Sequence, residues 1–318
     1  MSGVVDIIGG TTVDIYVSVP RFPRGIGAEF SRSTLAHCGR AASLTIGGNG
    51  GLAAFMLGRL GQRVRLYTRL GEDFWGGWIR SQLEGVGVEL ASDSTDEESS
   101  TNVVATDGEG SRLSFFHALE AQYVVRAPLP DTKVMFLGGC PHPNADLIAS
   151  YVRPYRNAGV TTVMDIGPPI PRPFRLDDLA QLADAVDLVT CNRAELRQLS
   201  GTTSLQRGVQ VIHKLGIPTV VVKDGAKGAL FSTSGDKHPH LLPAETTEPV
   251  TGTVGAGDSF NAGLLYALAN ATSIAVAVAF ANQIARAVLR ATDRLNVDVM
   301  GAGIYKAAFA DQVRLLEV

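Results

Sequence analysis

Cysteine is scarce in this chain, and the few cysteines present are badly placed for pairing or for binding a metal. Only three occur among 318 residues, and they stand far apart at Cys38, Cys140 and Cys191, without any CxxC pair. Neither a disulfide framework nor a zinc site is supported by this pattern. The first residues also lack a basic leader followed by an apolar stretch and a cleavage site. We therefore expect a cytoplasmic protein.

Long hydrophobic runs and an excess of basic charge are missing as well. The most apolar stretch, Ile274 to Leu289, is interrupted by Asn282, Gln283 and Arg286, so it falls short of the roughly 18 apolar residues that a membrane span needs. The 28 basic and 31 acidic residues give a net charge of −3, and the basic residues are scattered rather than clustered. We expect neither a membrane nor a nucleic acid as a partner.

Several familiar catalytic motifs are absent too. The chain has no GxxxxGK[ST] loop, which excludes a P-loop kinase, and it has neither a GxSxG elbow nor an HExxH helix, which leaves hydrolase chemistry without support. Glycine, by contrast, is abundant, with 35 of 318 residues or about 11%, against a usual value of about 7%. This excess predicts several places where the backbone approaches another segment or a ligand closely.

The composition is that of a globular protein with a large core. Hydrophobic residues make up 45% and charged residues 19% of the chain, which excludes intrinsic disorder. Short apolar runs alternate with helix-length segments, the pattern of βαβ units around a mostly parallel sheet. We expect strands within Val4–Gly10, Val64–Gly71, Val134–Gly139, Val160–Gly167, Val186–Asn192 and Thr219–Gly225. The whole chain, 1–318, is predicted to form a single α/β domain.

Two stretches interrupt this alternation. The first runs from Thr11 to Thr45, and the second, Thr101 to Val125, has a polar DGEGS turn between two β-rich runs and is typical of a hairpin. We expect them to form a small β-sheet excursion built from about 11–45 and 95–125. The acidic residues 92–100 are predicted to be an exposed connector.

The strongest local signal is a glycine-rich turn that leads into an apolar helix, at Thr251 to Asn270. Because the first amides of a helix have no intrahelical acceptor, the N–H groups of Gly255, Ala256 and Gly257 can hold an anion together with the helix dipole. Asp258 follows directly, and a carboxylate there is well placed to accept a proton from an attacking hydroxyl. This pairing predicts phosphoryl transfer. An ordinary helix cap is the alternative interpretation.

Two segments resemble the signatures of the ribokinase-like carbohydrate kinases, the PfkB family: Thr253 to Phe260 (TVGAGDSF) and Gly47 to Gly61 (GGNGGLAAFMLGRLG). The motifs GGTTVD, GEDFWG, NRAE and KDGAKGA also follow in family order. The resemblance implies a three-layer αβα fold with a mostly parallel central sheet and a small β-sheet lid. It implies an enzyme that transfers the γ-phosphate of ATP to a hydroxyl of a sugar or sugar derivative, and a homodimer formed through the lid.

By this resemblance, Asp258 is the base that deprotonates the acceptor hydroxyl, and the backbone amides of Gly255 to Gly257 stabilise the transferring phosphoryl group. Asn192 and Glu195 match an NxxE element that acts near the metal and the phosphates. Carboxylate and amide oxygens suit Mg²⁺, often through its waters. The alternative for this pair is a capped helix with the glutamate at its third position.

Lys223, Gly225 and Gly228 match the nucleotide-binding loop of the family. Glycines there let the backbone approach the nucleotide, and Lys223 is placed to meet a phosphate. A plain hairpin turn between the β-rich runs TVVVK and GALFS is the alternative. The resemblance also places Asn282 near the adenine.

The acceptor side is assigned by the same resemblance. Asp14 falls where the family has a carboxylate that binds sugar hydroxyls, Gly47 and Gly48 open the loop beneath the sugar, and Asn49 supplies a substitute hydrogen bond where ribokinases carry lysine. Without the resemblance, a charged residue just after a buried strand is more often a solvated loop residue.

Two departures from the family pattern bear on the substrate and on the cofactors. Leu52 stands where the family usually has asparagine, which weakens the case for ribose and keeps a nucleoside kinase of the same family as an alternative. Gly252 stands where the family usually has an aspartate that helps to build a monovalent-cation site, which puts activation by potassium in doubt.

Two rival functions start from the same residues. Gly48 to Ala53 fits the GxGxxA fingerprint of a dinucleotide site, with Glu72 and Asp73 about 20 residues later, as in NAD(P)-dependent oxidoreductases. The preceding strand is short, however, and TVGAGD has no role in that reading. A catalytically inactive sugar-binding protein on the same fold is the other rival, and the presence of Asp258 counts against it.

Overall fold

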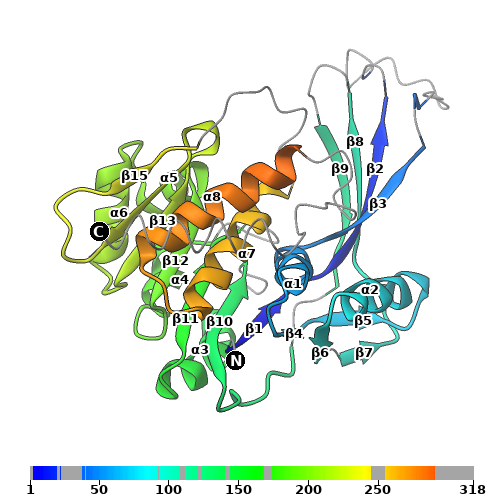
Figure 1. Cartoon of the computed structure of the whole chain (residues 1–318), viewed down its shortest axis with the longest axis horizontal. Helices are drawn as coiled ribbons and strands as arrows, with labels where there is room; N and C mark the ends of the chain where they lie inside the picture. Colours follow the sequence, from blue (N-terminus) through cyan, green and yellow to red (C-terminus); the bar gives the residue numbers. More distant parts are fainter. Residues whose placement is uncertain are drawn as a thin grey trace.

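The computed structural model describes residues 3–19, 22, 38–39, 41–91, 93–107, 112–119, 123–139, 144–167, 174–244 and 255–290. At its centre is a nine-stranded sheet (Figure 1). In spatial order its strands are β15 (His240–Leu242), β14 (Ala229–Thr233), β13 (Thr219–Lys223), β12 (Leu188–Asn192), β11 (Thr161–Asp165), β10 (Thr132–Gly138), β1 (Val4–Gly9), β4 (Val64–Tyr67) and β6 (Val88–Leu90). Pairings from β13 to β6 are parallel, and β14 and β15 join antiparallel. The prediction of a mostly parallel sheet is confirmed.

The central strands are buried on both faces, which explains their continuous apolar sequences. Along β10, Val134 and Phe136 pack into one hydrophobic cluster, whereas Met135 and Leu137 pack into the cluster on the opposite face. Successive side chains of a strand point to opposite faces, so an apolar run of this kind needs a covering layer on each side.

Helices form these two layers. One cluster contains residues of α1 (Asn49–Arg59), α2 (Phe74–Gly85), α7 (Ala256–Ala269) and α8 (Ile274–Arg290), and the other contains residues of α3 (Ala145–Asn157), α4 (Leu176–Ala180), α5 (Arg193–Ser200) and α6 (Leu205–His213). The predicted three-layer αβα arrangement is thus confirmed (Figure 1). Among the described helices, including the apolar α8, none has the length and apolarity that a membrane crossing requires.

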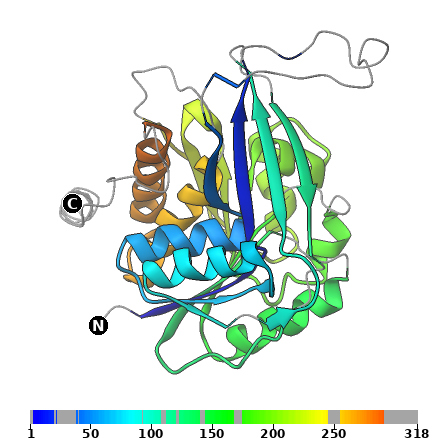
Figure 2. The same cartoon turned by 90° about the vertical axis from the view of Figure 1, so that its right-hand side faces the viewer.

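A second, four-stranded sheet projects from this body (Figure 2). Its order is β3 (Ser43–Gly47), β2 (Thr12–Ser18), β8 (Thr101–Thr106) and β9 (Arg112–His117). The central pairing of β2 with β8 is parallel, and the two outer pairings are antiparallel. Its strands therefore come from two distant parts of the chain. Residues 23–37, within one of the predicted excursions, lie outside the described residues.

Of the stretch predicted as an exposed connector, the described residues 93–100 are exposed only in part. Its residues 93–95 form β7 (Asp93–Thr95), which pairs with β5 (Arg69–Gly71) in a small parallel sheet. Ser99 is buried, and its backbone N–H and its hydroxyl both donate to the Asp73 carboxylate, over 2.8 and 2.7 Å. The prediction of exposure was wrong at Ser99 because Asp73, the N-cap of α2, offers a partner for its polar groups.

Glycines allow the N-terminus of α1 to sit directly on the main sheet. A side chain on Gly9 of β1 would lie 2.9 Å from the Cα of Gly50, and one on Gly138 of β10 would lie 2.9 Å from its nitrogen. Gly48 has a φ of 79°, and a Cβ there would lie 2.4 Å from a backbone oxygen. These are backbone approaches of the kind that the glycine content predicts. They place Asn49 beside the ends of the central strands.

Candidate active site

The predicted functional residues come together at one edge of the main sheet. The parallel neighbours β11, β12 and β13 end at Asp165, Asn192 and Lys223. Asn49, the first residue of α1, donates a hydrogen bond to Asp165 over 3.2 Å. Ligands of open parallel sheets bind beyond the carboxyl ends of the strands. This edge is therefore the candidate active site.

Helix α7 begins in the way that an anion site requires. Gly255 is the N-cap residue with a φ of 78°, in the left-handed region that favours glycine, and no side chain caps this helix end. Ala256 and Gly257 then supply helix-starting N–H groups that have no acceptor within the helix. The N-cap residue itself offers no side-chain acceptor, and Asp258 is the acidic residue of the first turn of the helix.

Asp258 stands in an unusual electrostatic environment. Burial raises the pKa of its carboxyl to about 7, and the negative charge of Asp165 adds to this rise. The Lys223 ammonium group opposes it, while Asp14 and Glu195 raise the pKa further. A carboxylate whose pKa lies near neutrality is matched to proton transfer at physiological pH.

Lys223 is held inside this edge of the sheet by two acceptors. Its Nζ donates to Asp165 Oδ1 over 2.7 Å and to Asn261 Oδ1 over 3.3 Å. Burial by itself lowers the pKa of Lys223, but the charges of Asp165 and Glu195 outweigh that effect and raise it. The lysine therefore remains a cation, and its ammonium group binds protein carboxylate in this structure.

Asn192 and Glu195 form a capping box at the start of α5. The capped helix was the alternative to a role of the NRAE motif near the metal. Asn192 Oδ1 accepts from the backbone N–H of Glu195 over 2.9 Å, and Glu195 Oε2 accepts from the backbone N–H of Asn192 over 2.7 Å. Burial and the charge of Asp165 raise the pKa of Glu195 to about 7. The pair caps α5 at the same edge of the sheet as Asp165, so the capping role is compatible with a ligand role.

The KDGAKGA segment forms a hairpin turn, which is the alternative to a nucleotide-binding loop given above. Strands β13 and β14 pair antiparallel around a short 3₁₀ turn, η1 (Gly225–Lys227). Gly225 has a φ of 60°, and Gly228, with a φ of 95°, would place a Cβ 2.2 Å from the Leu242 carbonyl oxygen. Asn282 Nδ2 donates to that same carbonyl over 3.1 Å. Asn282 therefore ties α8 to β15 here.

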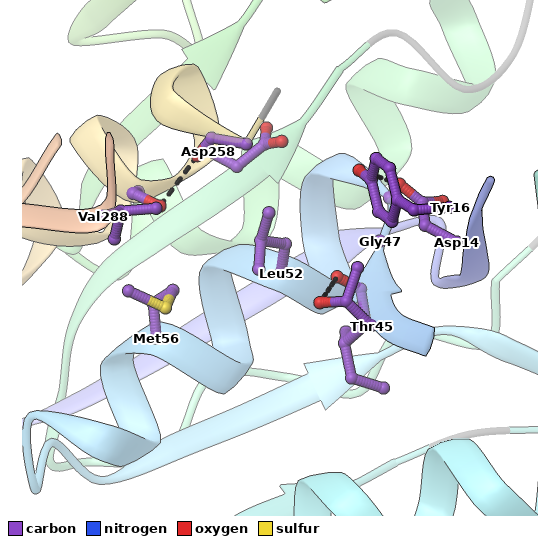
Figure 3. A pocket seen from close by; sticks show the side chains of 12 residues that line it. Asp14, Tyr16, Thr45, Gly47, Leu52, Met56, Asp258 and Val288 are labelled. Atoms are coloured by element: carbon purple, nitrogen blue, oxygen red, sulfur yellow. Dashed lines mark hydrogen bonds between the residues drawn. The ribbon is translucent and has the colours of Figure 1, made fainter. Parts of the chain in front are cut away.

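A pocket separates Asp258 from the strands of the small sheet (Figure 3). Its polar end carries Asp14, Tyr16 and Thr45, and Leu52 projects between this end and Asp258. The complete lining comprises Asp14, Tyr16, Thr45, Ile46, Gly47, Gly48, Leu52, Met56, Gly255, Asp258, Ser259 and Val288. The pocket thus has a polar end, an apolar side and a candidate base.

Asp14 is the buried carboxylate at the polar end, at 8% exposure. It accepts hydrogen bonds from the Thr12 hydroxyl (2.8 Å), the Tyr16 hydroxyl (3.2 Å) and the Asn102 amide (3.3 Å). Burial raises the pKa of Asp14, and these donors counteract the rise. A Cβ on Gly47 would lie 2.2 Å from Asp14 Oδ1, so the loop beneath this carboxylate requires glycine.

Sequence reasoning missed several residues of this site. Asp165 ends the run VTTVMDIG, and a carboxylate at the carboxyl end of a predicted parallel strand was the available signal. Asn261 lies one turn after the turn-and-aspartate motif and is fully buried. Tyr16, Met56 and Val288 fit strand and helix periodicities, and nothing local distinguishes them from core residues.

Within the described ranges, no group of three His, Cys, Asp or Glu side chains is placed to hold a metal ion.

An open parallel sheet, a helix start without a side-chain cap and a neighbouring carboxyl with a raised pKa are the features expected of an α/β phosphotransferase. Comparison with known proteins specifies the family. Residues 7–296 match the model of the pfkB family carbohydrate kinases. The chain belongs to this family, and its members are phosphotransferases that act on an alcohol group.

Individual proteins that resemble this chain are sugar and nucleoside kinases. Ribokinase from Arabidopsis thaliana is 27% identical over 84% of this chain and 71% of its own length. A nucleoside kinase from Methanothermobacter thermautotrophicus is 25% identical over 87% of this chain and 86% of its own. The structure of Arabidopsis thaliana ribokinase complexed with ribose and ATP superimposes with a TM-score of 0.76 at 22% identity, covering 99% of both chains.

The family match leaves the dinucleotide interpretation without support, and the structure gives the physical reason. The GxGxxA glycines pack against the chain itself: a Cβ on Gly48 would lie 2.4 Å from the Gly10 carbonyl oxygen, and one on Gly50 would lie 2.7 Å from the carbonyl carbon of Gly9. Glycines that are used for internal packing leave no reason to invoke a pyrophosphate.

Proposed function

We propose that this protein transfers the γ-phosphoryl group of MgATP to a hydroxyl of a sugar-like acceptor bound between Asp14 and Asp258. The observation that carries the proposal is the start of α7, where uncapped amides adjoin a carboxylate with a pKa of about 7. In this scheme the hydroxyl proton passes to Asp258 while the amides of Gly255 to Gly257 receive the charge of the transferring phosphoryl group.

The nucleotide side is assigned from position and from the family resemblance. The hairpin turn around Gly225 and Gly228 borders the same strand, β13, that ends at Lys223. We assign Asn192, Lys223, Gly225, Gly228 and Asn282 to this side. Lys223 and Asn282 both donate hydrogen bonds to other groups of the protein. We therefore assign these two side chains the role of holding the nucleotide site in shape, rather than of contacting the nucleotide directly.

Glu195 fits Mg²⁺ as a single carboxylate near the phosphates. Its oxygens already accept two hydrogen bonds from Asn192, so waters of the metal are its natural partners, in keeping with the reluctance of Mg²⁺ to lose its waters. When bound, the metal supplies charge neutralisation for the phosphates.

The four-stranded sheet is assigned as a lid over the acceptor, because β2 carries Asp14 and Tyr16 into the pocket. Three large apolar side chains of β9, namely Leu113, Phe115 and Phe116, are 42%, 60% and 46% exposed. Large apolar side chains exposed on the strand at the edge of a sheet are a feature of surfaces that contact another chain. They support the proposed homodimer, in which two lid sheets meet. A cytoplasmic location remains part of the proposal.

The test of the function is nucleotide consumption by the pure protein. We expect ADP formation that depends on one acceptor from a panel of sugars, sugar acids, phosphosugars and nucleosides, in the presence of Mg²⁺. Purified, folded protein that consumes no ATP with any acceptor of such a panel would contradict the proposal. The same assay separates an active kinase from a catalytically inactive sugar-binding protein.

The apolar side of the pocket favours an acceptor that carries an apolar edge. Leu52, Met56 and Val288 line the pocket near Asp258, and a hydroxyl facing them has no hydrogen-bond partner, which costs about 1–3 kcal/mol. Nucleosides and deoxygenated sugars present such an edge. The apolar lining therefore supports a nucleoside as a second candidate acceptor, in addition to a simple sugar.

Leu52→Asn is expected to shift the acceptor preference toward the more hydroxylated member of a matched pair. Asparagine has similar size but offers hydrogen bonds, so the ratio of kcat/KM for an acceptor and its deoxy analogue should change by about tenfold or more. Leu129→Asn, at a 40% exposed leucine, is the control. An unchanged ratio in Leu52→Asn would remove Leu52 from acceptor selection.

Potassium is expected to activate this enzyme little. The resemblance places an anionic ligand for a monovalent cation at the position of Gly252, which lies outside the described residues and has no carboxylate. A hard cation loses affinity with each anionic oxygen ligand that is removed. Rates in potassium and in an inert cation at equal ionic strength measure this, and strong activation by potassium would contradict it.

A further inference from the structure

An ion pair joins the carboxyl ends of strands β11 and β13 at the candidate active site. Lys223 Nζ lies 2.7 Å from Asp165 Oδ1, and the two side chains are 15% and 3% exposed. The other carboxylate oxygen of Asp165 accepts from Asn49 Nδ2 over 3.2 Å. Asn261 Oδ1, fully buried, accepts from Lys223 over 3.3 Å. Both charged groups are therefore held in place from two sides.

This pair lies beside the candidate base. A Cβ built on Gly257, the residue before Asp258, would be 3.9 Å from Lys223 Nζ. The charged groups that act on Asp258 come from four elements: Asp14 on β2, Asp165 on β11, Glu195 on α5 and Lys223 on β13. Among these groups of the described structure, three are carboxylates and Lys223 is the cation.

We propose that Asp165 and Lys223 are positioning residues for the base: Asp165 fixes the ammonium group of Lys223 beside Asp258, and that ammonium group keeps Asp258 ionised among the surrounding carboxylates. The inference rests on the proposed function. In the reaction, the bond from the acceptor oxygen to the γ-phosphorus forms, the bond from that phosphorus to ADP breaks, and the hydroxyl proton moves to Asp258. Only ionised Asp258 can take that proton.

An isolated change at Lys223 is a poor test, because Asp165 would then be buried without its cation and would take up a proton itself. The informative comparison is Asp165→Asn against the double variant Asp165→Asn/Lys223→Met. The first removes one negative charge and retains the ammonium group, whereas the second removes both charges. The two variants differ only in the ammonium group.

The readout is the acidic limb of the pH profile of kcat. In Asp165→Asn the amide oxygen of residue 165, together with Asn261 Oδ1, still accepts from Lys223 Nζ and keeps the ammonium group in place, while the negative charge is removed. The acidic limb should therefore move to lower pH, by about one unit or more. Adding Lys223→Met should move it back to higher pH by a comparable amount. Melting temperatures of both variants, measured in parallel, report any general loss of folding.

A purely structural ion pair gives a different result. In that case the melting temperature falls in one or both variants while the acidic limb stays at the wild-type pH, and this outcome overturns the inference. Carboxyl titration followed by ¹³C NMR, with the Asp258 signal assigned by its loss in Asp258→Asn, gives the same ordering of pKa values without turnover. An inactive wild-type enzyme would therefore contradict the proposed function, whereas an unshifted Asp258 titration would contradict the inference alone.

Discussion

Replacing Asp258 with asparagine is expected to lower kcat by about 10²- to 10⁴-fold, because a positioned general base contributes on that order to a proton transfer. Asparagine has the same size and cannot accept the hydroxyl proton. The amides of Gly255 to Gly257 remain at the start of α7, so ATP affinity should change little. Steady-state rates with the true acceptor and equilibrium binding of ATP measure the two effects separately.

Asp146→Asn is the matched control for this experiment. Asp146 also lies in the first turn of a helix, α3, but it is exposed, and its substitution should leave kcat near the wild-type value. A cap tolerates asparagine in place of aspartate almost without cost, so a helix-capping Asp258 would behave like Asp146. Near wild-type turnover of Asp258→Asn would therefore refute the assignment of the base.

The predicted architecture was confirmed because its signals are local and strong. The strand within Val134–Gly139 is apolar at nearly every position, since β10 is covered on both faces. Helix-length segments between such runs leave few arrangements other than right-handed crossovers in a parallel sheet. The two strands that break the rule, β14 and β15, follow a tight turn at Gly225 to Gly228 that reverses the chain.

The candidate site was predictable only where a contiguous motif carries it. The turn before Asp258 and the NRAE segment are each contained in a few residues, and each has a known physical use at a helix start. Asp165 belongs to no such motif. Its partners Lys223 and Asn49 are 58 and 116 residues away in sequence, and only the order of the strands brings them together.

The apolar side of the pocket could not be predicted from the sequence for a different reason. Met56 and Val288 are buried helix residues, at 2% and 3% exposure, with the spacing of ordinary core positions. A helix residue that faces a ligand and one that faces a strand have the same sequence pattern. The distinction comes from where β2 and the start of α7 leave a space, and this is a tertiary property.

Asp14→Asn is expected to lower kcat/KM for the acceptor by about 10- to 150-fold. The Asp14 carboxylate is buried at the polar end of the pocket, and a hydrogen bond to a charged group contributes about 1.5–3 kcal/mol, with about 1.4 kcal/mol for each factor of ten. Asparagine retains the size and one acceptor oxygen but loses the charge. Since Asp14 is placed on the acceptor side, the KM for ATP should stay close to its wild-type value.

The control for Asp14 is Asp131→Asn, which neutralises an exposed aspartate that pairs with Arg63 just before β10. It changes the net charge equally, so it should leave the kinetics of both substrates unaltered. Thr12 and Asn102 both donate to Asp14 Oδ1 and keep that acceptor when the amide oxygen of Asp14→Asn takes its place, whereas Tyr16 donates to Oδ2 and loses its acceptor. The loss of stability is therefore limited to about one hydrogen bond. A variant whose melting temperature falls while its kcat/KM for the acceptor is unchanged would show that Asp14 only holds β2 against β8. A loss in kcat/KM at an unchanged melting temperature places its carboxylate on the acceptor.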